Sequence, residues 1–104
     1  MKPIGTHNYF VYILTNKNKT TIYTGVTNDL QHRLWQHKEE SESSRRTFVG
    51  RYNCTNLIYF EHFDYIQDAI DREKEIKGWT RKKKDVLIEK FNPTWRFLNN
   101  EIEE

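Results

Sequence analysis

The hydrophobic and polar positions near the start of the chain predict a pair of β-strands. Residues 9–14 and 22–26 are rich in β-branched and aromatic side chains, whereas residues 15–21 between them are polar and rich in turn formers. This pattern indicates an antiparallel hairpin. A further run of the same kind over residues 57–63 predicts a third strand.

Three longer segments predict helices. Asn28 or Asp29 can cap a helix that begins at Leu30 and fades near Ser41. Two more helices are expected at about 65–77 and about 81–91. The order ββαβαα, with short connections between the first strands, predicts an α+β fold: a small three-stranded antiparallel sheet flanked by helices.

The remaining segments place this fold in one domain. The serine- and arginine-rich residues 41–51 are expected to form a mobile loop, and residues 95–98 to pack back as an aromatic anchor. We expect residues 1–104 to form a single domain with its core over about 9–98, because the chain is too short for a second domain.

Composition narrows the class of protein. The single cysteine, Cys54, allows no intramolecular disulfide, and neither a leader nor an apolar membrane span is visible, so we expect a cytoplasmic protein. A net charge of +2 argues against a protein that coats nucleic acid. Residues 101–104 are acidic, so the rest of the chain is more basic than the net charge of +2 suggests. This distribution is compatible with a local basic groove.

The first predicted helix carries polar residues on its apolar stripe. Leu30, Arg33, Leu34 and His37 share the face that should contact the sheet. Arginine at such a position either extends to the surface or serves a site, and a single histidine is commonly structural. Both together, after a hairpin that bears two tyrosines, favour a site.

The second predicted helix shows the same anomaly. Glu73 lies within the stripe formed by Ile66, Ala69, Ile70 and Ile76, so it faces the interior or a cleft and needs Arg33, a backbone donor or a bound cation. A structural ion pair with Arg33 is the simplest alternative to a metal site. The positions outside the stripe look like a solvated surface: Asp71, Arg72, Lys74 and Glu75.

Tyr12 and Tyr23 fall on neighbouring strands, although the sequence does not fix their register. Tyrosines in strands are commonly packing residues, so neither is diagnostic alone. Gly25 interrupts the second strand, where glycine marks a bulge or the close approach of another group.

Several separated motifs resemble the GIY-YIG nuclease superfamily. The resemblance covers residues 9–98 and is closest to its small stand-alone bacterial proteins, which are similar to the excision-repair incision nuclease domain. It rests on Val11-Tyr12-Ile13, Tyr23-Thr24-Gly25, Gly25-x-Thr27-x-Asp29-Leu30-x-x-Arg33, His37, Glu73-x-x-Ile76-Lys77 and the later Asn92-Pro93-x-Trp95. The chain departs from the signature at Phe10, Val11 and Thr24, and Val26 stands where repair-type domains carry a lysine.

The resemblance implies a metal-dependent endonuclease with one divalent cation, Mg²⁺ or Mn²⁺, held by Glu73. It also implies that Arg33 holds the phosphate, that Tyr12 or Tyr23 assists deprotonation of water, and that His37 positions or activates the nucleophile. Because a tyrosine is a weak base at neutral pH, we favour His37 and a tyrosine acting as a coupled pair; the sequence leaves open which one takes the proton.

Basic residues outside this group are candidates for sequence-independent phosphate contacts. We expect DNA rather than RNA as the partner, with weak sequence preference and a role in repair or processing. The candidates are Arg45, Arg46, Arg72, Lys74, Lys77, Arg81, Lys82, Lys83 and Lys84.

Two other functions stay open from the sequence. The first is a nucleic-acid-binding module whose nuclease activity is lost or negligible. The second is an interaction protein that does not bind nucleic acid. The sequence does not indicate the oligomeric state.

Overall fold

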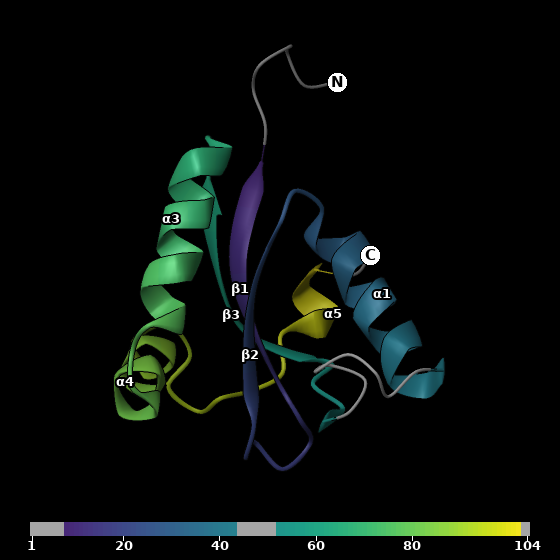
Figure 1. The fold of residues 1–104 in the computed structure, drawn as a ribbon. Helices are drawn as coiled ribbons and strands as arrows, with labels where there is room; N and C mark the ends of the chain where they lie inside the picture. The colour runs from purple at the N-terminus through teal and green to yellow at the C-terminus, as the bar shows by residue number, and fades with distance from the viewer. Residues whose placement is uncertain (1–7, 44–51, 103–104) are drawn as a thin grey trace.

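A three-stranded antiparallel sheet forms the middle layer of the protein (Figure 1). The computed structural model describes residues 8–43 and 52–102. β1 (Tyr9–Thr15) lies at the centre, and β2 (Ile22–Thr27) and β3 (Asn56–Phe63) pair with its two edges. The predicted hairpin and third strand are therefore confirmed.

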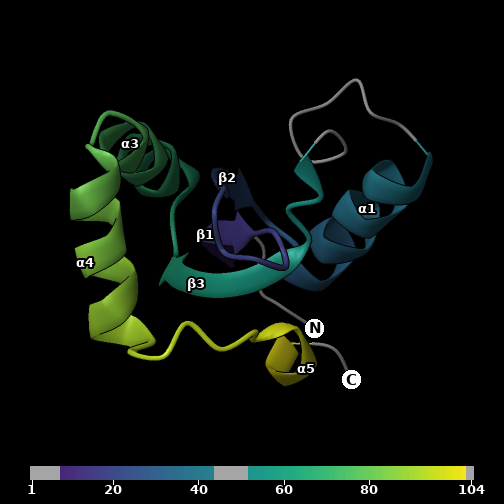
Figure 2. The same ribbon diagram turned by 90° about the horizontal axis from the view of Figure 1, so that it is seen from below.

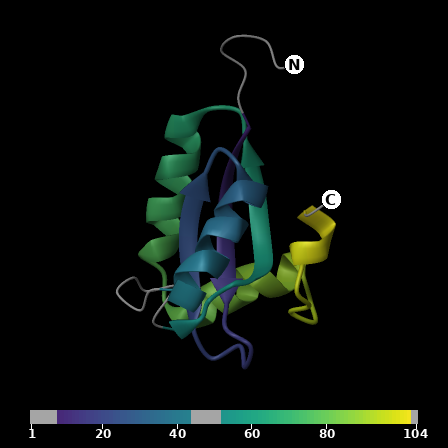
Figure 3. The same cartoon turned by 90° about the vertical axis from the view of Figure 1, so that its right-hand side faces the viewer.

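Helices cover both faces of this sheet (Figures 2 and 3). α1 (Leu30–Ser43) and the short α5 (Asn99–Ile102) lie on one side, and α3 (Ile66–Lys77) and α4 (Arg81–Phe91) lie on the other. The order ββαβαα is confirmed, with α5 as an addition that the sequence pattern did not predict. α1 continues to Ser43 rather than fading near Ser41.

The central strand β1 separates two parts of the core. Successive side chains of a strand point to opposite faces, so Val11 and Ile13 pack with α3 and α4, whereas Tyr12 and Leu14 pack on the α1 side. All four are buried. Cys54 is buried on the α1 side, where burial raises the pKa of its thiol to about 11, as fits a core residue.

The predicted apolar stripe of α3 is correct only in part. Ala69 and Ile76 are fully buried and Ile70 is half-buried, but Ile66 exposes 52% of its surface. The prediction for Ile66 is wrong because the first turn of α3 borders an open hollow beside β2 rather than the closed core.

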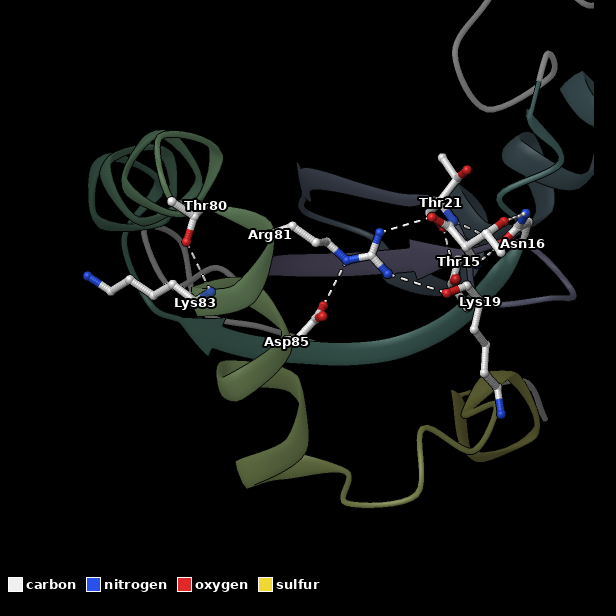
Figure 4. A network of polar contacts seen from close by, with 9 residues as sticks. Thr15, Asn16, Lys19, Thr21, Thr80, Arg81, Lys83 and Asp85 are labelled. Atoms are coloured by element: carbon white, nitrogen blue, oxygen red, sulfur yellow. Dashed lines mark hydrogen bonds and ion pairs between the residues drawn. The ribbon is translucent and has the colours of Figure 1, made fainter.

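A single arginine fastens α4 to the hairpin (Figure 4). Arg81 donates to the backbone carbonyls of Lys19 and Thr20, at 3.3 and 2.9 Å, and its Nε lies 2.8 Å from a carboxylate oxygen of Asp85. The Thr80 hydroxyl caps the same helix end by accepting from the backbone N–H of Lys83. Arg81 therefore joins the start of α4 to the turn between β1 and β2.

The C-terminal tail lies along the outer edge of β3. The backbone N–H of Leu98 donates to the carbonyl of Leu57 (2.7 Å), and the Leu57 N–H donates to the side chain of Asn99 (2.8 Å). Leu98 is buried and Trp95 packs partly against the core, whereas Phe97 is exposed, so the predicted anchor is only partly aromatic. The other sheet edge is that of β2, and the candidate site lies beside it.

No helix within residues 8–43 or 52–102 has both the length and the apolar character needed to span a membrane.

Candidate active site

The polar stripe of α1 contacts a tyrosine of the central strand. Leu30, Leu34 and His37 are buried against the sheet, and Arg33 is half-buried beside them. The side-chain oxygen of Asp29 accepts from the backbone N–H of His32 and so caps the helix, as the sequence allowed. The helical period therefore places Arg33 and His37 where the sequence predicted them, facing Tyr12.

The hydroxyl of Tyr12 joins His37 to Arg33. Its oxygen lies 2.8 Å from Nε2 of His37, and Nε of Arg33 donates to it over 3.3 Å. Arginine can only donate, so the tyrosine oxygen accepts from Arg33 and must place its own proton elsewhere. Tyr12 is fully buried, and His37 Nε2 is the acceptor within reach in the described chain. Neutral His37 thus carries its proton on Nδ1.

Burial makes both partners of this hydrogen bond neutral at pH 7. It raises the pKa of Tyr12 to about 12, an effect that the hydrogen bond from Arg33 opposes. Burial, and then the positive charge of Arg33, lower the pKa of His37 to about 4. The site therefore holds a protonated phenol against an unprotonated imidazole, which is the arrangement needed to pass a proton from one to the other.

Gly25 makes room for the Tyr12 hydroxyl. The two residues are directly paired across β1 and β2. A Cβ atom at position 25 would lie only 2.5 Å from the hydroxyl oxygen and 2.6 Å from the ring carbon that bears it. The close approach expected at this glycine is that of the Tyr12 side chain.

Tyr23 stands beside this pair on β2. Its ring centre lies 6.4 Å from that of Tyr12 and 5.5 Å from that of His37. The ammonium group of Lys77 lies 5.9 Å from the Tyr23 ring centre and so brings α3 to the same group. The structure therefore collects both predicted tyrosines, the histidine and the arginine around one point at the β2 edge.

Glu73 reaches this edge from α3. Its carboxylate pairs with Lys77 at 3.1 Å, one helical turn away, and not with Arg33. The Glu73 side chain is only 16% exposed, which agrees with its predicted position inside the stripe. The ion pair with Arg33, considered as an alternative from the sequence, is absent among the contacts of the described residues.

The Glu73 carboxylate fits the chemistry of a magnesium or manganese ligand. A hard divalent cation takes oxygen donors, and Mg²⁺ commonly keeps several waters while using one or two carboxylates. The carboxylate already attracts one cation, Lys77, whose side chain is 48% exposed and free to swing away. Within the described ranges there is no cluster of three or more acidic, histidine or cysteine ligands, so any such metal would rely mainly on water and substrate oxygens.

Arg33 differs from the other arginines that the structure describes. Arg72, Arg81 and Arg96 each pair with at least one carboxylate. Arg33 instead donates to the Tyr12 hydroxyl and, over 3.2 Å, to the side-chain oxygen of Gln36, which are both neutral. No ion pair within the described residues therefore engages its positive charge.

The other predicted basic residues differ in how the fold holds them. Arg72 is not the solvated surface residue that the helical pattern suggested, because it is half-buried between Glu61, Glu75 and the Trp79 ring. Lys83 also lies over Trp79, and Arg81 is held by the hairpin turn. Contact of these residues with nucleic acid stays a prediction. Lys74 and Lys82 are exposed, Lys84 is half-buried, and Arg45 and Arg46 lie outside the described residues.

Two polar neighbours were not found by sequence reasoning. Gln36 accepts from Arg33, and a carboxylate oxygen of Glu40 lies 4.0 Å from Nδ1 of His37. Each follows its partner by three residues along α1, a spacing that brings side chains together on a helix. That three-residue spacing is the feature of the sequence from which both neighbours could have been predicted.

Comparison with known proteins agrees with this geometry. Residues 8–85 match the family described as the GIY-YIG catalytic domain. The chain belongs to this family. The match contains Tyr12, Tyr23, Arg33, His37 and Glu73, and GIY-YIG domains are nuclease domains, so the family places the protein among nucleases.

Relatives of similar length carry the designation UPF0213. A UPF0213 protein of Bacillus pumilus is 38% identical over 85 residues, covering 82% of this chain and 83% of that protein. Another, from Haloquadratum walsbyi, is 38% identical over 81 residues, covering 78% and 86%. The solution NMR structure of a UPF0213 protein from Bacillus halodurans is 32% identical, covers 78% of this chain and 82% of its own, and gives a TM-score of 0.48.

Proposed function

We propose that this GIY-YIG protein is a metal-dependent endonuclease that hydrolyses phosphodiester bonds in DNA with weak sequence preference. The observation that carries the proposal is Arg33, which forms no ion pair with a carboxylate in the described chain and touches the buried Tyr12–His37 pair. A role in DNA repair or processing in the cytoplasm is part of the same proposal.

The residues of the site can divide the work of hydrolysis. Arg33 binds the non-bridging oxygens of the phosphate with its planar donor group and stabilises the charge that builds up there in the transition state. The Tyr12 hydroxyl receives a proton from the attacking water as it gives its own to Nε2 of His37, 2.8 Å away. Tyr23, beside both rings, orients the water or the phosphate.

Glu73 would hold the single Mg²⁺ or Mn²⁺, with Lys77 displaced from it. When bound, such a cation neutralises phosphate charge and lowers the pKa of a bound water. Lys77 and the exposed Lys74 and Lys82 supply further positive charge for the DNA backbone.

A second function, nucleic-acid binding with negligible cleavage, is favoured by two observations. The Glu73 carboxylate is already paired within the protein, by Lys77. Val26 also stands where the resemblance to repair-type domains expects a lysine. A protein of this kind would bind DNA through Arg33 and the lysines without using the carboxylate.

Cleavage of labelled single- and double-stranded DNA, and of matched RNA, with Mg²⁺ or Mn²⁺ separates the two functions. Glu73→Gln should abolish cutting, whereas Glu75→Gln removes the same charge from the solvent side of α3 and should retain it. Equal cutting by both variants would refute the role of Glu73. Binding by the wild type without any cutting would establish the alternative.

A further inference from the structure

A hollow of about 320 Å³ opens directly beside Arg33. α1 and α3 both begin at the end of the sheet where β2 finishes (Figure 1), and the hollow lies between them. Val26 and Asn28 line it from β2 and the loop that follows, and Ile66 and Ile70 line it from α3. Arg33 contributes the charged group among these residues.

Part of the wall of this hollow is apolar although it is open to solvent. Ile66 exposes 52% of its surface here, in a helix whose Ala69 and Ile76 are fully buried. Ile70 and Val26 are half-buried beside it. A single exposed isoleucine is ordinary, but apolar side chains gathered around an arginine form a surface with two chemistries. Val26 maintains the apolar wall where a lysine would interrupt it.

The size and charge of the hollow fit one nucleotide. Its volume is at the lower end of the range for small-molecule sites, roughly 300–1,000 Å³, and a double helix is far too wide to enter it. Arg33 offers a phosphate partner, and the isoleucines offer an apolar surface for the face of a base. The Asn28 side chain can hydrogen-bond a base edge.

We infer that this hollow binds an unpaired nucleotide that adjoins the phosphate held by Arg33. The inference rests on the proposed function and defines its substrate class: single-stranded DNA, or duplex DNA that can release a nucleotide at a frayed end, gap or flap. Intact duplex DNA would meet Arg33 and the lysines without filling the hollow.

Binding measured without metal tests this inference separately from catalysis. Ile66→Ser removes apolar surface from the wall without adding charge. Because Ile66 is exposed, the variant should fold. Val86→Ser is the matched control, because Val86 is a similarly exposed β-branched residue on α4, away from the hollow. The probes are fluorescent oligothymidylate and a hairpin duplex of equal charge, both titrated in EDTA.

Ile66→Ser should weaken binding to oligothymidylate by about tenfold, in line with the loss of a base contact, and leave binding to the hairpin within about twofold. Val86→Ser should change neither. Equal weakening for both probes, or no weakening, would overturn the inference. If the wild type prefers single strands but never cuts DNA, only the proposed catalysis fails.

A separate observation concerns His37. Its Nδ1 atom is buried and lacks a hydrogen-bond partner in the described chain, although it must carry the proton of the neutral ring. The Glu40 carboxylate lies 4.0 Å from this nitrogen, on a side chain that is 33% exposed. A small rotation of the glutamate would complete the contact.

The groups that face His37 identify Glu40 as its counter-charge. Tyr12 of β1 and Tyr23 of β2 contact the ring through their phenol groups. Arg33 lies one turn away on α1 and opposes a positive ring, and Lys77 of α3 lies beyond Tyr23. Glu40 is the neighbour whose charge favours the imidazolium.

We propose that Glu40 is a positioning residue that orients His37 and stabilises the imidazolium formed when the ring takes the Tyr12 proton. This too rests on the proposed function. The Tyr12 oxygen gives its proton to His37 Nε2 as it takes one from the attacking water.

Nitrogen NMR of the His37 ring tests this role on the protein alone. In the wild type, Nδ1 should be protonated and Nε2 should not; the reverse tautomer would overturn the proposal. Glu40→Gln should lower the pKa of His37, by about one unit or tenfold in proton affinity. Glu42→Gln, which removes the same charge from the exposed end of α1, should leave it unchanged.

Cleavage by Glu40→Gln should fall by about tenfold with KM unchanged, because the variant alters proton transfer and not binding. An unchanged pKa of His37 in Glu40→Gln would refute the proposal whether or not the wild type cuts DNA. A lowered pKa without any wild-type cleavage would keep the contact and reject the nuclease.

Discussion

A tyrosine and an arginine share a polar network on each face of the sheet, but the two networks differ in how their charge is balanced. On the α3 side, the Tyr59 hydroxyl donates to Glu61 (2.5 Å), and Arg72 lies between Glu61 (3.2 Å) and Glu75 (2.6 Å). On the α1 side, Tyr12 donates to the neutral His37 and accepts from Arg33.

The difference separates a stabilising network from a reactive one. Carboxylates compensate Arg72, and burial together with the hydrogen bond to Glu61 raises the pKa of Tyr59, so that phenol keeps its proton. Arg33 forms no ion pair in the described chain, and the Tyr12 hydroxyl donates its proton to an unprotonated imidazole. In the proposed function a phosphate completes the second network, whereas the first needs no ligand.

The largest expected effect comes from removing Arg33. Arg33→Ala should lower the cleavage rate by about 100- to 1,000-fold, because one donor to the charged transition state is lost. Its unfolding free energy should fall by about 1–2 kcal/mol, because two hydrogen bonds from the charged, partly exposed guanidinium to neutral acceptors disappear. Steady-state cleavage and urea unfolding measure the two quantities. Arg96→Ala removes an arginine from an exposed ion pair and should leave both unchanged.

Gly25→Ala should disturb the Tyr12 network next most strongly. The added methyl group would lie 2.5 Å from the Tyr12 oxygen, in a buried site where the ring cannot swing aside. We expect a loss of about 3 kcal/mol in unfolding free energy, as for an overpacked core, and loss of cleavage by the folded fraction. In a Tyr12→Leu background, which lacks both the hydroxyl oxygen and the ring carbons that the methyl group would meet, Gly25→Ala should cost less unfolding free energy than in the wild type. An equal cost in both backgrounds would show that the glycine serves the backbone instead.

Acid should lower the unfolding free energy through the buried His37, whereas the Tyr59 network should not contribute to this loss. The pKa of His37 is about 4 in the fold, below its ordinary value of 6.5, so the unfolded chain binds a proton first as the pH falls. This contribution to stability is complete above pH 6.5 and is lost between 6.5 and 4, by about 2 kcal/mol at pH 5.

Urea unfolding at pH 7 and pH 5 measures this loss. His37→Gln should remove about 2 kcal/mol of the pH dependence, because glutamine does not titrate. Tyr59→Phe should keep the wild-type dependence, since the Tyr59 network contains no histidine. Equal pH dependence in the wild type and His37→Gln would mean that the imidazole is not buried as a neutral base.

Local sequence patterns predicted the strands, the main helices and the part of the site that depends on spacing within one helix. The 3.6-residue period of α1 places Arg33 and His37 on one face wherever that helix packs, so their common position was readable from the sequence. Lys77 likewise follows Glu73 by four residues, within reach on any helix. The choice between Lys77 and Arg33 as the partner of Glu73 was not readable, because it depends on how α1 and α3 flank β2.

Contacts between elements explain the remaining differences. Tyr12 meets Gly25 only in the register that β1 and β2 adopt, and this register follows from packing on both faces of β1. Arg72 looked solvated because its partners, Glu61 and Trp79, lie on other elements. The exposure of Ile66 depends on where α3 overhangs the sheet edge.

The smallest expected effect is on the balanced network itself. Arg72→Ala should reduce the unfolding free energy by about 1 kcal/mol, because the guanidinium is partly exposed and its removal leaves Glu61 able to reach water. Glu61→Gln should cost a similar amount, and the double variant should cost less than the sum, since both changes remove one interaction. Urea unfolding of the two single variants and the double variant, each compared with the wild type, completes this double-mutant cycle. Additive losses would show that Arg72 packs on Trp79 independently of Glu61, and the contrast with Arg33 would then rest on stacking rather than on charge.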